Sequence, residues 1–293
     1  MTSEKHEHYY VPHDTHWPIV GSIGLFITVI GAVQLVHQDY LYGTPIFLIG
    51  LAIILFMMYG WFSNVIHESQ QGLYSAQLDR SFRWGMVWFI VSEVMFFGGF
   101  FGALFYARFL AVPWLGGLGD KLSTHTMLWE NFQAAWPLIH NPDPNQFPSA
   151  HAVMAAWGIP ALNTLILLTS AATITVAHHA LKNNNRTLLK LGLWATILLG
   201  VTFLGFQAYE YIHSYTELNL KLSTGIYGTT FFMLTGFHGL HVTIGAIMLF
   251  VILLRCYRGH FTPEKHFGFE AAAWYWHFVD VVWLTLFVFV YWL

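Results

Sequence analysis

Residues 82–112 read FRWGMVWFIVSEVMFFGGFFGALFYARFLAV, a nearly unbroken apolar run that carries one acid, Glu93. A helix needs about 20 apolar residues to cross a bilayer, so this run predicts a transmembrane helix. A carboxylate is costly in hydrocarbon, which makes Glu93 a candidate functional residue and favours its uncharged form. A neutral carboxyl that only bonds a neighbouring helix is an equally good interpretation. Gly98 and Gly102, four residues apart, predict close contact with another helix.

The composition is that of an integral membrane protein. Of the 293 residues, 56% are hydrophobic and 9% are charged, whereas soluble domains carry about 25% charged residues. The net charge of -3, without a basic stripe, argues against a nucleic-acid partner. The single cysteine, Cys256, excludes an internal disulfide and a cysteine-rich metal site. The polar first sixteen residues meet the first apolar run without a cleavage motif, so we expect no cleavable signal.

Seven segments are long and apolar enough to span a membrane. They predict an all-α integral membrane protein, because continuous helices satisfy their own backbone hydrogen bonds in lipid. We interpret residues 1–293 as a single domain. The predicted spans are residues 17–36, 44–66, 82–112, 157–181, 188–212, 226–254 and 269–292.

The lysines and arginines predict the orientation of the chain. With a cytoplasmic N-terminus, nine of them lie on inner segments and three on outer segments, a clear positive-inside bias. An odd number of spans then places the C-terminus on the periplasmic side. The inner residues are Lys5, Arg80, Arg83, Lys182, Arg186, Lys190, Arg255, Arg258 and Lys265, and the outer ones are Arg108, Lys121 and Lys221.

Residues 113–156 form a long, polar outer segment that holds five of the ten prolines. Within it, apolar residues recur at helical spacing, which suits a short amphipathic helix, and a plain surface loop is at least as good an interpretation. These residues are Leu128, Phe132, Ala135, Trp136 and Ile139.

Further polar residues lie inside the later spans. His238 and His241 are one helical turn apart, as are His277 and Asp280, and this spacing suits either metal ligands or hydrogen bonds between helices. No second strong ligand pair accompanies them, so we favour the hydrogen bonds and expect no metal. Glu210 lies toward the outer end of its span, where we expect an acid that reaches the interface.

Several stretches resemble a known family. HFGFEAAAWYWHFVDVVWL at residues 266–284 and YGTTFFMLTGFHGLHV at residues 227–242 resemble signatures of subunit III of the haem-copper cytochrome c oxidases. Similar stretches are IVSEVMFFGGFF at residues 90–101, AHHAL at 177–181, QAYEY at 207–211 and the start at 8–17, with Tyr9 and Tyr10. Together they reach over nearly the whole chain.

The resemblance implies an accessory subunit of a proton-pumping oxidase that reduces oxygen with electrons from cytochrome c. In that family subunit III holds no haem or copper, which reside in subunits I and II, and it packs against subunit I. Two helices and five helices form separate bundles around a cleft filled by phospholipid. The subunit supports proton uptake into subunit I and protects the enzyme from inactivation during turnover. The long outer segment favours a bacterial inner membrane as the location.

The resemblance also implies roles for individual residues. Glu93 resembles the family's carbodiimide-reactive membrane acid. The residues that resemble lipid-cleft positions are Trp61, Phe62, Glu68, Arg83, Phe89, His241, Arg255, His266 and Phe267. Phe62 and His67 stand where the family often has Trp and Arg. His238, His277, Asp280 and Glu210 are expected to join helices.

Three alternatives stay open at this point. Subunit III of a quinol oxidase is one alternative, since the electron donor binds another chain, although the first two helices, often missing from the quinol type, are present and the tail resembles the cytochrome c type better. A stand-alone proton transporter would use Glu93 and the intramembrane histidines, although paired repeats and interrupted helices are not evident. A metalloenzyme or b-type cytochrome would use the same histidines as ligands.

Overall fold

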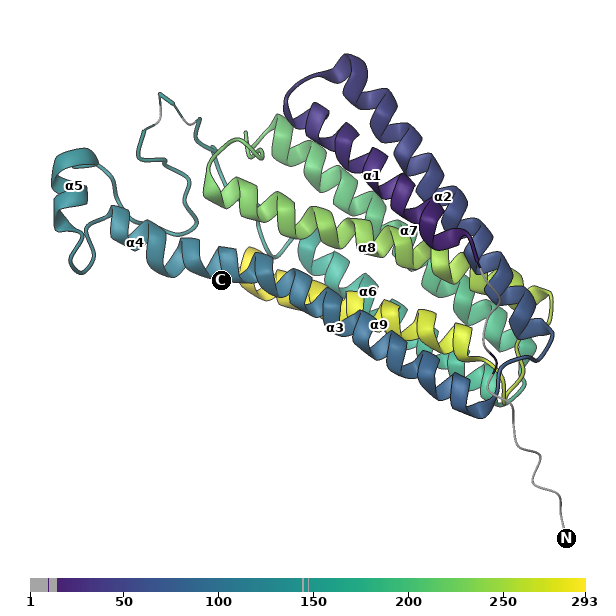
Figure 1. Cartoon of the computed structure of the whole chain (residues 1–293). Helices are drawn as coiled ribbons and strands as arrows, with labels where there is room; N and C mark the ends of the chain where they lie inside the picture. The colour runs from purple at the N-terminus through teal and green to yellow at the C-terminus, as the bar shows by residue number, and fades with distance from the viewer. Residues whose placement is uncertain (1–9, 11–14, 144, 147) are drawn as a thin grey trace, which may run out of the picture. The chain divides into compact units, whose positions relative to one another are not determined.

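The computed structural model describes residues 10, 15–143, 145–146 and 148–293, and within them every regular element is helical. Seven of the helices are long and apolar enough to cross a membrane, which confirms the predicted fold class (Figure 1). His8, Tyr9 and Lys5, which entered the sequence predictions, lie outside the described residues. The orientation in the membrane stays a prediction.

The helices run further than the apolar segments that predicted them. The second, third and fifth predicted spans gain polar residues at one or both ends, and Asp39 and Asn185 cap α2 and α7 by accepting backbone N–H groups. Hydropathy marks the part in lipid, whereas caps mark the end of the helix. The elements are α1 (Trp17–Val36), α2 (Tyr40–Gln70), α3 (Ala76–Tyr106), the π-helix η1 (Ala107–Ala111), α4 (Val112–Leu115), α5 (Leu122–Leu128), α6 (Ile159–Lys182), α7 (Arg186–Thr216), α8 (Ile226–Tyr257), α9 (Phe267–Leu286) and the π-helix η2 (Phe287–Trp292).

The chain divides into two compact units, Met1–Trp84 and Gly85–Leu293. The expected grouping into two helices and five helices is observed, with the boundary inside α3. In the first unit, α1 and α2 are held together by glycines: the buried residues of these two helices are Gly24, Gly31, Gly43 and Gly50.

The glycine contacts bring the two backbones of the first unit together. A Cβ at Gly31 would collide with the backbone of Phe47, and one at Gly50 with the backbone of Thr28. Small residues allow such close approach in membranes, where packing rather than the hydrophobic effect drives helix association. Most side chains of both helices are left on the outside of the pair.

The second unit is built around α9, which packs against α6 and α8, while α7 packs against α6 and α8. Trp276 and Trp283 of α9 are fully buried. The indole Nε1 of Trp276 donates to Ser170 Oγ at 2.9 Å, and that of Trp283 donates to Thr164 Oγ1 at 2.9 Å, both on α6. Each large apolar ring therefore also satisfies its one polar atom.

The glycines of α3 do not make the contact predicted for them. A Cβ added at Gly98 or Gly102 would meet no described atom of its own unit within 4 Å. The part of α3 in the second unit packs through aromatic residues instead. The ring of Phe89 is stacked on that of Tyr275 of α9 at a centroid distance of 6.1 Å.

Of the two interpretations of residues 128–139, the loop is observed and the amphipathic helix is not. The helix there is α5, which ends at Leu128, and the following residues run without regular structure. Residues just beyond this stretch contact a distant loop: the side-chain Nδ2 of Asn141 donates to Thr224 O at 3.2 Å, and His151 N donates to Leu218 O at 2.8 Å. The outer segment is thus bound to the connection between α7 and α8.

Candidate functional site

Glu93 and His241, which the sequence singled out separately, form one pair. His241 Nε2 on α8 lies 2.9 Å from Glu93 Oε2 on α3. The exposed fraction is 10% for the His241 side chain and 22% for Glu93, so the contact is largely shielded. The two residues are 148 positions apart, which is why no local pattern predicted that they meet.

The hydrogen bonds restrict where the proton of this pair resides. His241 Nδ1 lies 2.6 Å from the carbonyl of Phe237, which only accepts, so Nδ1 carries hydrogen. Nε2 of a neutral ring must then accept, and Glu93 must be the protonated donor. In the other state the proton has moved to Nε2 and the pair is ionic. The pair therefore shares one proton between a carboxyl and an imidazole.

Aromatic rings surround the pair. The rings of Phe96 and Phe97 lie 5.9 and 5.0 Å from that of His241, and the ring of Tyr275 is stacked on it at 6.3 Å. These three rings place apolar surface against the His241 imidazole.

The other intramembrane histidines lie at separate contacts. His238 is fully buried, and its Nε2 donates to the carbonyl of Val279 on α9 at 3.2 Å. His277 Nδ1 lies 3.8 Å from Asp280 Oδ2, and its Nε2 lies 3.4 Å from Thr175 Oγ1 on α6. His238 and His277 thus each contact a neighbouring helix, whereas neither carboxylate oxygen of Asp280 has a hydrogen-bond partner among the described residues.

Glu210 does not reach the interface, and that expectation is wrong. Its exposed fraction is 0%, and Tyr291 donates its hydroxyl to Oε1 at 2.6 Å. Tyr291 lies in η2, so this bond joins α7 to the end of the chain. No sequence pattern pairs Tyr291 with Glu210, because an aromatic residue near a span end more often marks the membrane border.

The proposed lipid positions of the first unit are partly occupied by local contacts. Trp61 and Phe62 are about half exposed and stack at 5.4 Å. Glu68 accepts from the Tyr74 hydroxyl at 2.9 Å. Arg83 Nε lies 2.8 Å from Asp79 Oδ2, one turn away on α3.

One of the proposed lipid positions of the second unit, Arg255, lies in a cluster of cationic residues. Arg255 lies over the ring of Phe261 at 4.3 Å, and Arg186 donates to the Phe261 carbonyl at 2.8 Å. Burial, with the guanidinium groups of Arg255 and Arg258 nearby, lowers the pKa of His260. Phe89 is 45% exposed, and Phe267 begins α9.

The predicted interhelical histidines do not form a group of possible metal ligands. Within the described residues the one group of three or more such side chains is His178, His266 and Glu270. It contains neither His238 nor His241, and the sequence did not predict it. Its members come from α6 and the start of α9, which the sequence alone could not bring together.

Comparisons with known proteins cover the whole chain. The family model described as "Cytochrome c oxidase subunit III" matches residues 6–128 and 119–293. Similar proteins, each named cytochrome c oxidase subunit 3, come from Marchantia polymorpha (43% identical, 99% of this chain and 97% of that protein), Drosophila melanogaster (41%, 100% and 99%) and Arabidopsis thaliana (41%, 100% and 98%). With its seven membrane-spanning helices, the chain therefore belongs to the cytochrome c oxidase subunit III family.

Proposed function

We propose that this chain is an accessory subunit, without a redox centre of its own, of a proton-pumping terminal oxidase that takes electrons from cytochrome c. The observation that carries the proposal is the family match over the full length of the chain, with relatives above 40% identity. In this proposal haem and copper belong to the partner subunits I and II, and this chain contacts subunit I directly. We place the complex in a bacterial inner membrane, with the N-terminus in the cytoplasm.

The Glu93–His241 pair is proposed to support proton uptake by the complex. Its two partners share one proton in an apolar enclosure, and His241 is held in one tautomer by the Phe237 carbonyl. Such a pair stores a proton without a net charge in the membrane. A purely structural pair would hold α3 against α8 in the same geometry, so only a measurement of proton uptake distinguishes the two roles.

Phospholipid binding is the second proposed role. Each unit offers exposed aromatic side chains of the proposed set, Trp61 in the first and Phe89 in the second. Arg255 in the second unit, beside the further cations Arg186 and Arg258, suits an anionic headgroup at the cytoplasmic leaflet. Lipid retained through purification would be identified by mass spectrometry. Loss of about one lipid per complex on Arg255→Gln is the expected result.

The proposed function is tested on the purified oxidase with and without this chain. We expect oxygen consumption to start at the normal rate in both preparations, and then to decay during turnover only where the chain is missing. Proton uptake, followed with a pH dye, should be slower without it. A preparation that keeps full and lasting activity without the chain would contradict the proposal.

A matched variant pair ties the effect to the buried carboxyl. Glu93→Gln removes the exchangeable acid, whereas Glu217→Gln alters an exposed glutamate that lies 3.3 Å from His213. The first variant should slow proton uptake and the second should not. A quinol oxidase remains a second candidate: reconstituted activity with quinol but not with cytochrome c would favour it. Proton flux through vesicles containing this chain alone would favour a transporter.

A further inference from the structure

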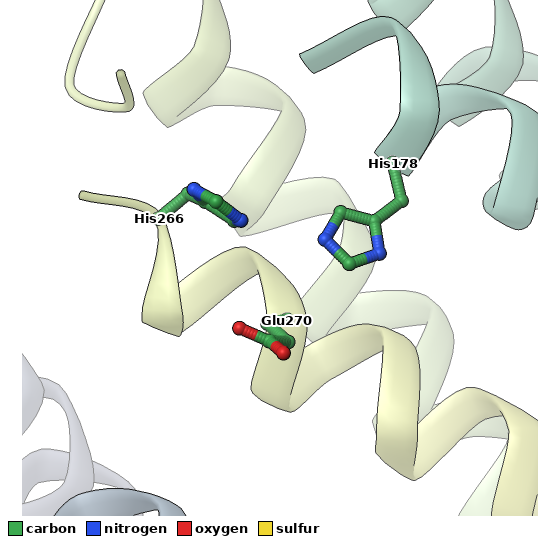
Figure 2. A group of neighbouring side chains, drawn as sticks. All are labelled: His178, His266 and Glu270. Atoms are coloured by element: carbon green, nitrogen blue, oxygen red, sulfur yellow. The ribbon is translucent and has the colours of Figure 1, made fainter. Parts of the chain in front are cut away.

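We propose that His178, His266 and Glu270 form a binding site for a divalent metal ion of the zinc type. The three side chains come from two helices of the second unit, and their possible ligand atoms all lie within 4.8 Å of one another. Figure 2 shows the His178 ring reaching from α6 toward His266 and Glu270 at the start of α9. This site goes beyond the proposed oxidase function and does not depend on it, although one of its ligands, His266, is also among the proposed lipid positions.

The donor set suits zinc. Two imidazoles and a carboxylate, with a fourth position open to water, are a common set of zinc ligands. Ligand bonds of about 2.0–2.1 Å place tetrahedral donors roughly 3.4 Å apart. The observed donors are within 4.8 Å of one another, so they would have to approach by up to about 1.4 Å to surround an ion.

The backbone prepares His266 to act as a ligand. Its Nδ1 lies 3.2 Å from the Thr262 carbonyl, which only accepts, so Nδ1 carries hydrogen and Nε2 presents a lone pair. A hydrogen bond from the second ring nitrogen to a carbonyl is the usual support of a metal-bound histidine. His266 also precedes Glu270 by one helical turn, and Glu270 N donates to His266 O at 3.1 Å.

His178 supplies the independent observation. Its Nε2 is buried and makes no hydrogen bond to any described residue. Its ring lies at 5.4 Å from that of His266, in an edge-on arrangement, and at 5.5 Å from Phe269. A buried imidazole nitrogen without a partner is costly, and an ion in the group would remove that cost.

The local charges oppose one another. Glu270 supplies negative charge, while Lys182 one turn beyond His178 on α6 is a cation. The C-terminal end of α6 favours a cation and the N-terminal end of α9 disfavours it. Because these helix effects have opposite sign, the three ligands decide the affinity. A basic end of the bundle would otherwise suit an anion such as phosphate, and the test includes that alternative.

The test uses the full chain, purified in detergent without an affinity tag and stripped of metal by a chelator. Zn²⁺ alone is added, and bound metal is measured by equilibrium dialysis and mass spectrometry. The variants are His178→Ala and Glu270→Gln, and the control is His179→Ala, because the adjacent His179 is exposed. Other histidines of the chain give a background that is the same in all variants. Circular dichroism confirms that each variant keeps its helices.

We expect the unaltered chain and His179→Ala each to bind one more Zn²⁺ than His178→Ala at the same concentration of free zinc. Removing the His178 ligand should weaken binding of that ion at least about tenfold. Cobalt in the same site should show the strong visible bands of a tetrahedral ion, and these should disappear in Glu270→Gln. If His178→Ala does not fold, Glu270→Gln decides the question. Equal zinc binding by all four proteins, or binding of inorganic phosphate instead of zinc, would overturn the proposal.

Discussion

The two units of this chain hold their helices together in different ways. In the first, α1 and α2 approach through glycines, and Gly31 and Gly50 lie against backbone. In the second, the centre is filled by tryptophan rings, and Trp276 occupies the space left by Gly200 and Gly245. The contact between α1 and α2 depends on glycines, which have no side chain, whereas the packing of α9 depends on large aromatic side chains.

The difference bears on what each unit can offer to lipid. Packing through glycine leaves the large side chains of α1 and α2 outward, and Trp61 is 49% exposed. Packing through tryptophan turns Trp276 and Trp283 of α9 inward, and Asp280 is buried on the same helix. The first unit therefore exposes large apolar side chains that lipid could contact, whereas the second encloses polar groups such as Glu210.

The largest effect is expected from Trp276→Ala in the second unit. The ring is fully buried, so its removal leaves a cavity and takes away the indole donor to Ser170 Oγ, which keeps its own bond to Leu167 O. Loss of a buried aromatic side chain costs about 3–5 kcal/mol of unfolding free energy. Unfolding in mixed micelles, followed by circular dichroism, measures it. Trp88→Ala is the control, because Trp88 is 67% exposed; equal losses would show that Trp276 does not hold the bundle.

Gly31→Ala tests the first unit in the opposite direction, by adding a methyl group. The new Cβ would meet the backbone of Phe47, which cannot move as a side chain can. We expect a loss of about 1–3 kcal/mol from overpacking. Gly98→Ala is the matched control, since nothing in its own unit lies within 4 Å of the added Cβ. It should be neutral or slightly stabilising, because alanine favours helix. Equal destabilisation by both would refute packing through Gly31.

The Glu93–His241 pair is tested by comparing Glu93→Gln with Glu93→Ala. A glutamine amide can still donate to His241 Nε2, whereas alanine leaves that nitrogen without a partner. If the pair is neutral, we expect alanine to cost about 1–2 kcal/mol more than glutamine. Unfolding of both variants in the His241→Ala background should abolish the difference. A glutamine variant as unstable as the alanine one would indicate an ion pair instead.

The sequence predicted the spans because lipid imposes a simple length and composition on each helix. It marked Glu93 for the same reason, since an acid in a long apolar run stands out. The helix ends were less predictable, because α2 and α7 continue into polar residues that hydropathy does not count. Spacing around Phe132 did not decide between a helix and a loop. The bonds that hold the outer segment run from Asn141 and His151 to the connection between α7 and α8, and local spacing does not reveal contacts of that kind.

The partners within the candidate site were beyond prediction from the sequence. Tyr291 bonds Glu210 across 81 positions, and Glu93 meets His241 across 148. The spacing of His238 and His241 predicted one shared face, but His238 contacts α9 and His241 contacts α3. One helical turn separates them by enough angle to reach different neighbours. Pairs of this kind depend on how the helices cross, which periodicity does not specify.

The smallest expected effect, from Ser170→Ala, distinguishes ring packing from hydrogen bonding in the second unit. The variant removes the acceptor for Trp276 Nε1 and leaves the ring in place. Interhelical hydrogen bonds in membranes average about 0.6 kcal/mol, far below the cost of removing the ring. Unfolding in the same micelles gives the value, and Thr164→Val makes the equivalent change beside Trp283. If either variant were as destabilising as Trp276→Ala, hydrogen bonds rather than ring volume would hold α9 to α6.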